Sequence, residues 1–133
     1  MATTSDTTPS KRYGSVIKLK PECYAKYKEL HAKVWPEVLD RLTKSNIRNY
    51  SIYFHKETGL LFAYLEYIGK NFEADWQAIA DDPKTKEWWK INCPLQEPFN
   101  WTDPKPLYEG GKGDWFTPME ELFHDGHSAV KFL

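Results

Sequence analysis

The segment 23–42, CYAKYKELHAKVWPEVLDRL, places a histidine between two aromatic residues at helical spacing. Tyr27, His31 and Trp35 are four residues apart, so an α-helix brings all three to one face. An imidazole titrates at about pH 6.5, which suits it to taking up and releasing a proton near neutral pH. A phenol at Tyr27 and an imidazole at His31 can therefore converge on one ligand and perform general acid–base chemistry. The alternative is that His31 is a satisfied core residue without a chemical role.

An adjacent tryptophan pair, Trp88 and Trp89 in EWWK, is the second candidate. Neighbouring residues of a helix point about 100° apart, so the two indoles cannot face the same way. Either one indole is core and the other covers an edge, or one ring forms the floor of a sugar site while the other supplies an N–H donor. Aromatic residues make up 16% of the chain. This content is typical either of rings buried for their area or of a pocket whose rings pack against the C–H faces of a sugar.

Other chemical signatures are weak. His124 and His127 in HDGH resemble metal-ligand spacing but lack partners, and His55 lies in a predicted hairpin loop. The glycine-rich stretch 110–113 is not followed by a helix, so no phosphate cradle is predicted. No dinucleotide fingerprint, P-loop, nucleophile elbow or paired glycosidase carboxylates can be identified. We therefore expect neither a metal nor a cofactor.

The overall composition narrows the class of partner. The 133 residues favour one domain, and 18 Lys+Arg against 19 Asp+Glu leave a net charge of −1. This balance offers no electrostatic reason to expect nucleic acid or an anionic membrane as a partner. Cys23 and Cys93 form no disulfide framework, and no stretch resembles a signal peptide or a membrane span. We therefore expect a cytoplasmic protein.

The elements that must position these residues follow the order β-α-β-β-α-β. Residues 1–10 are small and polar, which predicts a disordered tail before a single domain over 11–133. Pro36 interrupts the first helical pattern and predicts a kink or a restart, with Trp35 at the break. The predicted elements are a strand at 12–20, a helix at 21–46, two strands flanking the loop 55–59, helices at 71–80 and 84–91, a long loop at 93–116 and a strand at 117–125.

This element order is that of a ferredoxin-like α+β sandwich. It predicts a four-stranded antiparallel sheet with the helices on one face. The opposite face would then carry Tyr or Phe side chains without cover. Because a second subunit can cover such a face, we expect a homodimer.

Five motifs resemble a known family: YKELHAKVWPEV, NYSIYF, LLFAYLEY, DWQAIA and EWWK, in this order. They are similar to those of L-rhamnose mutarotases, small dimeric proteins of the α+β-barrel type. The similarity runs from Arg12 to Ile91 and resumes in the last strand. The resemblance implies that His31 is a general acid in an isomerase acting at the anomeric carbon. It implies the following substrate-contacting residues: Tyr27, Tyr50, Trp88 and Trp89.

The chain departs from the bacterial pattern after the tryptophan pair. That pattern continues with Lys-Tyr-Met and a further Met, whereas this chain reads Lys90-Ile91-Asn92-Cys93-Pro94. The loop up to Trp115 is also longer and richer in aromatic residues. These differences concern the pocket wall and leave the identity of the sugar open.

The implied reaction interconverts the α and β pyranose forms of an aldose through the open aldehyde. One imidazole near the anomeric hydroxyl and the ring oxygen can act as acid and then as base, with a tyrosine or water completing the transfer. The expected substrate is L-rhamnose or a related 6-deoxy sugar, whose buried methyl group contributes on the order of 1 kcal/mol of binding. No metal or cofactor takes part.

Two other functions fit the same fold order. Tyr50 and Phe54 share a strand face and could stack on bases as in RNA-recognition domains, although the net charge argues against this. A haem-degrading enzyme or an oxygenase of the dimeric α+β-barrel class, with His31 as an axial ligand, is the third possibility.

Overall fold

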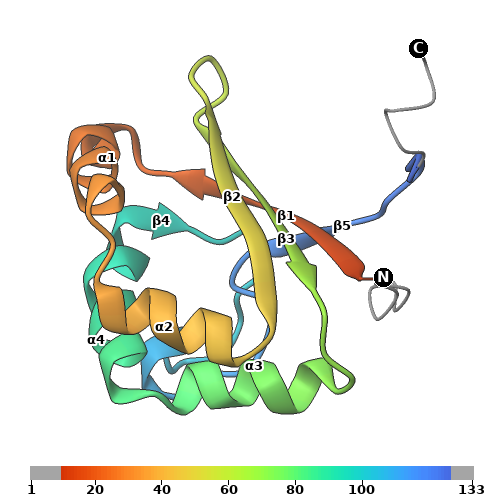
Figure 1. Cartoon of the computed structure of the whole chain (residues 1–133). Helices are drawn as coiled ribbons and strands as arrows, with labels where there is room; N and C mark the ends of the chain where they lie inside the picture. Colours follow the sequence, from red (N-terminus) through yellow and green to blue (C-terminus); the bar gives the residue numbers. More distant parts are fainter. Residues whose placement is uncertain (1–9, 127–133) are drawn as a thin grey trace.

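The computed structural model describes residues 10–126, and its framework is one curved antiparallel sheet (Figure 1). β1 (Lys11–Leu19) lies inside the sheet, with β3 (Leu60–Tyr67) beside it and β2 (Ile47–His55) beyond β3. On its other side β1 pairs with two short strands, β4 (Gln96–Glu97) and β5 (Thr117–Met119). The order β2-β3-β1-β4 is that of a ferredoxin-like sheet, which confirms the predicted α+β class.

The helices gather on one side of the sheet (Figure 1). Short 3-10 turns precede and follow them, at Pro21–Cys23, Cys93–Leu95 and Leu107–Glu109. The α-helices of the described residues are α1 (Tyr24–Ala32), α2 (Pro36–Lys44), α3 (Phe72–Asp81) and α4 (Pro83–Asn92).

The predicted interruption at Pro36 is confirmed. The chain leaves α1 at Ala32 and begins α2 at Pro36, and Trp35 before the proline has an extended backbone with ψ of 134°. The proline ring disfavours helical geometry in the preceding residue, and it lacks the N–H that would continue the helical ladder. The predicted shared face therefore holds for Tyr27 and His31 on α1, whereas Trp35 lies beyond the end of that helix and packs against Trp88 of α4.

Caps define the start of both later helices. The Asn71 side chain accepts a hydrogen bond from Ala74 N at 3.1 Å at the start of α3. At the start of α4, Asp82 Oδ2 accepts from the backbone N and the hydroxyl of Thr85, at 2.9 and 3.0 Å. These caps satisfy backbone donors that a helix leaves unpaired at its first turn. Pro83 occupies the first turn of α4, where its missing N–H costs nothing.

The core lies between the sheet and the helices. Alternate β1 residues point toward the helices, and Ile17 and Leu19 are buried there together with Tyr27 of α1. A second buried cluster joins strand residues to Ile79 of α3. The members of the two clusters are Ile17, Leu19, Tyr27 and Leu61, and Ile47, Leu65, Tyr67 and Ile79.

The C-terminal part differs from the prediction. The segment 93–116, expected as one long loop, contains two 3-10 turns and β4, which pairs with the end of β1 through Lys18↔Glu97 and Leu19↔Gln96. A two-residue strand carries no alternating pattern, so the sequence does not signal it. The last strand is shorter than the predicted 117–125, because β5 ends at Met119.

Two predicted features lie outside the residues that the structure describes. Apart from Ser10, the predicted tail at residues 1–10 lies outside the described residues, as does His127. Over the part of the chain that the structure describes, none of the helices has the length and apolar character needed to cross a bilayer.

Candidate active site

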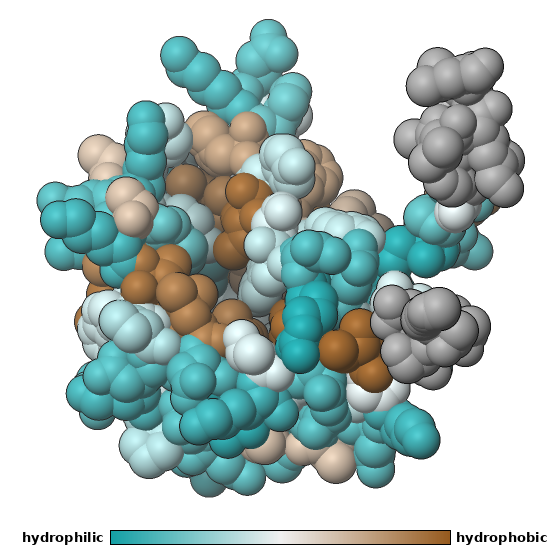
Figure 2. Space-filling model, viewed as in Figure 1, coloured by the Kyte–Doolittle hydropathy of each residue, from teal (hydrophilic) through white to brown (hydrophobic). Residues whose placement is uncertain are grey.

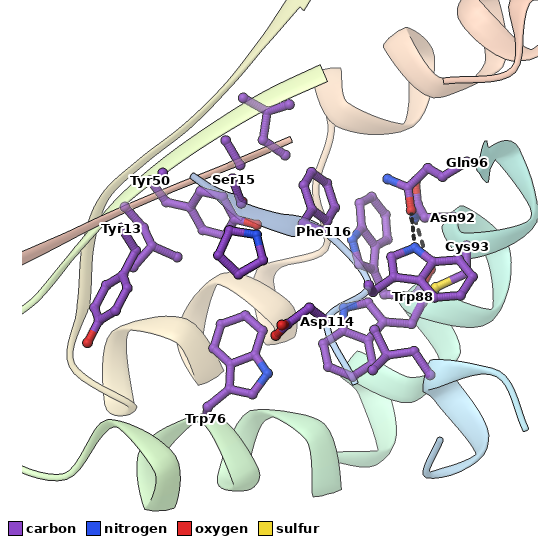
Figure 3. Close-up of a pocket in the computed structure, with 18 of the residues that line it drawn as sticks. Tyr13, Ser15, Tyr50, Trp76, Trp88, Asn92, Cys93, Gln96, Asp114 and Phe116 are labelled. Atoms are coloured by element: carbon purple, nitrogen blue, oxygen red, sulfur yellow. Dashed lines mark hydrogen bonds between the residues drawn. The ribbon is translucent and has the colours of Figure 1, made fainter. Parts of the chain in front are cut away.

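A cavity of about 330 Å³ lies between the sheet and the helices. Figure 2 shows hydrophobic side chains gathered in a hollow on this side of the molecule. In Figure 3, Ser15 and Tyr50 reach the cavity from the strands, Trp76 from α3, and Trp88 and Asn92 from α4. A volume of this order matches the lower end of small-molecule pockets, about 300 Å³.

A second cavity of about 310 Å³ adjoins the first and shares several walls with it. Six residues line both cavities: His31, Tyr50, Ile52, Trp76, Trp88 and Trp89. The remaining wall of the second cavity is almost entirely apolar. Half of its residues, Val38, Leu39 and Leu42, come from α2, and the others are Val34, Ile79 and Thr85. His31 thus lies where a polar, aromatic cavity meets an apolar one.

The imidazole of His31 is fixed by its own helix. Its Nδ1 lies 3.0 Å from the backbone oxygen of Tyr27, and its ring stacks on the Tyr27 ring with centroids 4.0 Å apart. Since a carbonyl oxygen only accepts, Nδ1 carries the proton of this hydrogen bond, which leaves Nε2 as the nitrogen that exchanges protons. Burial lowers the pKa of His31 below its ordinary value of 6.5, so the neutral base predominates at pH 7.

The Tyr27 hydroxyl belongs to a buried polar chain. It accepts a hydrogen bond from Gln96 Nε2 at 3.1 Å, and Gln96 Oε1 accepts one from Trp115 Nε1 at 2.8 Å. Burial raises the pKa of Tyr27 well above that of a free phenol, so the hydroxyl keeps its proton over the neutral range.

Tyr50 reaches the cavity because β2 contains an irregularity. The pairing of β2 with β3 shifts register between Arg48 and Ser51, and Asn49 has a positive φ of 50°, a conformation that asparagine tolerates. Although 38% of Tyr50 is exposed, Figure 3 shows its ring extending from β2 toward the cavity. Burial raises the pKa of Tyr50 to about 12.

The two adjacent tryptophans diverge, as predicted. Trp88 is buried and meets His31 and Trp35 edge-on, with ring centroids 5.3 and 5.2 Å away. Trp89 instead stacks with Trp76 of α3 at 6.4 Å. Both indoles line both cavities, so they form two walls of one space.

The structure brings all five predicted site residues to the first cavity and adds others that sequence reasoning missed. Asp114 is the one carboxylate of the described residues that lines this cavity. Trp76 lies on α3, and several of the others come from the segment 93–116, where the sequence predicts a long loop without site residues. The missed wall residues with polar or aromatic side chains include Trp76, Asn92, Gln96, Asp114, Trp115 and Phe116.

The other histidines lie away from this site. His55 is the last residue of β2 and not part of the loop as predicted; it is exposed, and its Nδ1 lies 2.8 Å from the Thr58 hydroxyl. His124 is exposed, in a segment without regular structure. Within residues 10–126, no group of three His, Cys, Asp or Glu side chains is arranged to hold a metal ion.

Comparisons with known proteins agree with this architecture. The family model for L-rhamnose mutarotase matches residues 12–125. An L-rhamnose mutarotase of Lactiplantibacillus plantarum is 36% identical over 113 residues, which span 85% of this chain and 96% of that protein. One of Bacillus subtilis is 37% identical over 87 residues, spanning 65% of this chain and 81% of that protein.

A solved structure extends the likeness to three dimensions. The crystal structure of an L-rhamnose mutarotase from Formosa agariphila superposes with a TM-score of 0.66 at 26% identity. The superposition covers 87% of this chain and 99% of that one. The matched region includes the strands and helices that carry the cavity, and by sequence and by fold this chain belongs to the L-rhamnose mutarotase family of isomerases, which act at the anomeric carbon.

Proposed function

We propose that His31 is the acid–base group with which this chain interconverts the α and β anomers of L-rhamnose or a related 6-deoxy sugar. The observation that carries the proposal is the position of His31: a neutral imidazole, fixed through Nδ1, at the junction of two cavities. The family match favours this activity over an RNA-binding module or a haem enzyme.

The proton transfers balance with one imidazole. Neutral His31 takes the proton of the anomeric hydroxyl through Nε2 and becomes an imidazolium. As the bond between C1 and the ring oxygen breaks, C1 becomes the aldehyde carbon and the imidazolium returns its proton to the ring oxygen. Rotation about C1–C2 presents the other carbonyl face, and the reverse steps close the second anomer.

The surrounding residues fit a sugar that must rotate while bound. We assign the walls to Trp88 and Trp89, whose indole faces pack against C–H groups without fixing one orientation. The hydroxyls of Tyr27 and Tyr50 provide polar contacts to the sugar. The apolar wall from α2 suits the methyl group of a 6-deoxy sugar, worth on the order of 1 kcal/mol.

Saturation-transfer NMR on L-rhamnose tests the proposal directly. Wild-type protein should exchange the two anomers faster than buffer alone, and the His31→Ala variant should return the rate to the buffer value, because no other neutral base is placed at this junction in the described residues. Circular dichroism serves as the folding control. Near-normal exchange by a folded His31→Ala protein would remove His31 from the mechanism.

We propose further that two copies pair through the sheet face opposite the helices. Val16, Phe62 and Tyr53 are cross-strand neighbours on this face, and Tyr53 is 67% exposed. Met119 of β5, opposite Gly14, adds another exposed apolar side chain, 41% exposed. An uncovered stripe of this kind on a sheet is typical of a surface that packs against a partner.

A cytoplasmic location is the setting we propose for the enzyme. Cys23 and Cys93 are both free thiols, and Cys93 is buried. Unpaired cysteines are typical of proteins in a reducing compartment. Fractionation of the source cells, with the protein followed by immunoblot, would contradict this if the protein appeared outside the cytoplasmic fraction.

A further inference from the structure

The side chain of Gln96 forms hydrogen bonds both to Trp115, in the C-terminal part of the chain, and to Tyr27 of the candidate site. Gln96 starts β4, 69 positions after Tyr27 in the sequence, and both are buried, with 7% and 6% exposure. Its amide makes two side-chain hydrogen bonds, one to Trp115 and one to the Tyr27 hydroxyl. In Figure 3, Gln96 lies beside Asn92 and Trp88 at the α4 side of the cavity.

The chemistry of the three groups fixes the direction of both bonds. An indole N–H can only donate, so the amide oxygen of Gln96 must face Trp115. The NH₂ group then faces Tyr27, whose oxygen accepts. A phenol that accepts through its oxygen still has its own proton to donate, and Tyr27 lines the first cavity.

We propose that Gln96 is a positioning residue, which holds the Tyr27 oxygen as an acceptor and thereby makes the Tyr27 hydroxyl proton available to a sugar oxygen. The inference rests on the proposed function and deepens it. Through its backbone Tyr27 fixes His31, and through its side chain, directed by Gln96, it provides the neighbouring donor. Tyr27 thus links the two groups that handle the sugar, because its backbone oxygen holds His31 and its own hydroxyl is oriented by Gln96.

The segment around Trp115 is built to hold this arrangement. Trp101 packs edge-on against Trp115 with ring centroids 5.0 Å apart, and Trp101 Nε1 donates to Lys105 O at 3.1 Å. Asp103 accepts hydrogen bonds from the backbone N of Lys105 and of Lys112, both at 2.8 Å. The segment is thus folded on itself, which gives the Trp115 indole a defined place from which to orient Gln96.

A glutamate at position 96 would make the direction of the bond depend on pH. As a neutral acid, Gln96→Glu offers a carbonyl oxygen to Trp115 and an O–H to Tyr27, which reproduces the wild-type pattern. As a carboxylate it can only accept hydrogen bonds. The Tyr27 hydroxyl then donates to it and is no longer free to donate to the sugar. Burial favours the neutral acid and moves its ionisation above the ordinary range for glutamate, into the pH range of the assay.

The expected result with Gln96→Glu is activity that falls as pH rises. The wild-type protein is the reference, because it contains every other titratable group of the cavity: Tyr13, Tyr27, His31, Tyr50, Cys93 and Asp114. The activity of the wild-type protein should fall at acid pH, where His31 gains a proton. It should not fall at the higher pH values at which the Gln96→Glu variant loses activity. A Gln96→Glu profile that superposes on the wild-type profile would overturn the inference.

A double-mutant cycle separates positioning from packing and does not depend on the glutamate variant. Gln96→Met keeps the length and apolar stem of the side chain but makes neither hydrogen bond. We expect it to lower kcat/KM for L-rhamnose by roughly tenfold, the scale of one hydrogen bond, and to have no further effect in a Tyr27→Phe background. An equal loss in both backgrounds would show that Gln96 only packs, and would overturn the inference.

Binding measurements keep this test distinct from that of the proposed function. L-rhamnose is titrated against the intrinsic tryptophan fluorescence of the same four proteins, and the Kd values should show the same coupling between positions 96 and 27. Absence of anomer exchange in the wild-type protein would contradict the proposed function. Active wild-type protein with independent effects at the two positions, in kcat/KM and in Kd, contradicts the role of Gln96 alone.

Discussion

At the scale of single residues, the site depends on hydrogen bonds with only one possible direction. His31 Nδ1 faces a carbonyl oxygen, and Gln96 faces an indole N–H, so neither the imidazole tautomer nor the amide orientation has an alternative. Burial then lowers the pKa of His31 and raises those of Tyr27 and Tyr50. The site therefore combines one neutral base with two protonated phenols across the neutral range.

The depressed pKa of His31 predicts the pH dependence of the reaction. Because the neutral imidazole is the form that takes the anomeric proton, activity is lost as pH falls through the His31 pKa, and this midpoint should lie below 6.5. The measurement is kcat/KM for L-rhamnose against pH, with the buffer-catalysed rate subtracted at each point. An acid limb with its midpoint above 6.5 would contradict the assigned environment of His31.

Sequence reasoning reached some of these residues and missed others for a physical reason. Tyr27 and His31 are one helical turn apart, so their contact follows from local geometry. Gln96 meets Tyr27 only because β4 pairs with the end of β1, a contact across 69 positions that no local pattern encodes. Tyr50 was named from the family resemblance, whereas the bulge that directs it could not be foreseen from strand alternation.

At the scale of elements, the helix interruption at Pro36 and the helix cap at Asp82 determine where the aromatic side chains of the cavity lie. The predicted helix boundaries near Pro36 and Asp82 agree with the structure, because proline and capping residues act locally and are visible in sequence. The wall formed by Trp88 and Trp89 depends on where α4 starts, since each residue of shift turns a helix by about 100°. The Asp82 cap sets that start.

Removing this cap should weaken both the fold and the site. Asp82→Ala leaves the backbone N of Thr85 without its side-chain acceptor, and we expect it to lower the free energy of unfolding by about 1 kcal/mol. Urea unfolding followed by tryptophan fluorescence measures the change. Asp82→Asn is the matched control, since an amide oxygen can still accept, and it should recover most of the loss. Equal destabilisation by the two variants would contradict a capping role.

At the scale of the whole molecule, the sheet has two unlike faces. The face toward the helices carries the core and the cavity, while the opposite face carries Val16, Tyr53, Phe62 and Met119 in neighbouring positions. The element order made this division predictable, since successive strand side chains point to opposite faces and the helices were expected to cover only one of them. The short β5 was predicted in place but not in length, because exposed residues after Met119 lack a partner strand in the described region.

The open face leads to a prediction about assembly. Sedimentation equilibrium should give twice the chain mass of 15.6 kDa, because pairing of two such faces removes their apolar side chains from water. Tyr53→Lys places a charge in the middle of the proposed interface and should shift the protein to the monomer. Ile91→Lys is the matched control: Ile91 is also exposed, at 37%, but lies on α4, so this variant should remain a dimer. A wild-type monomer at all concentrations would exclude the interface, and dissociation by both substitutions alike would place it elsewhere.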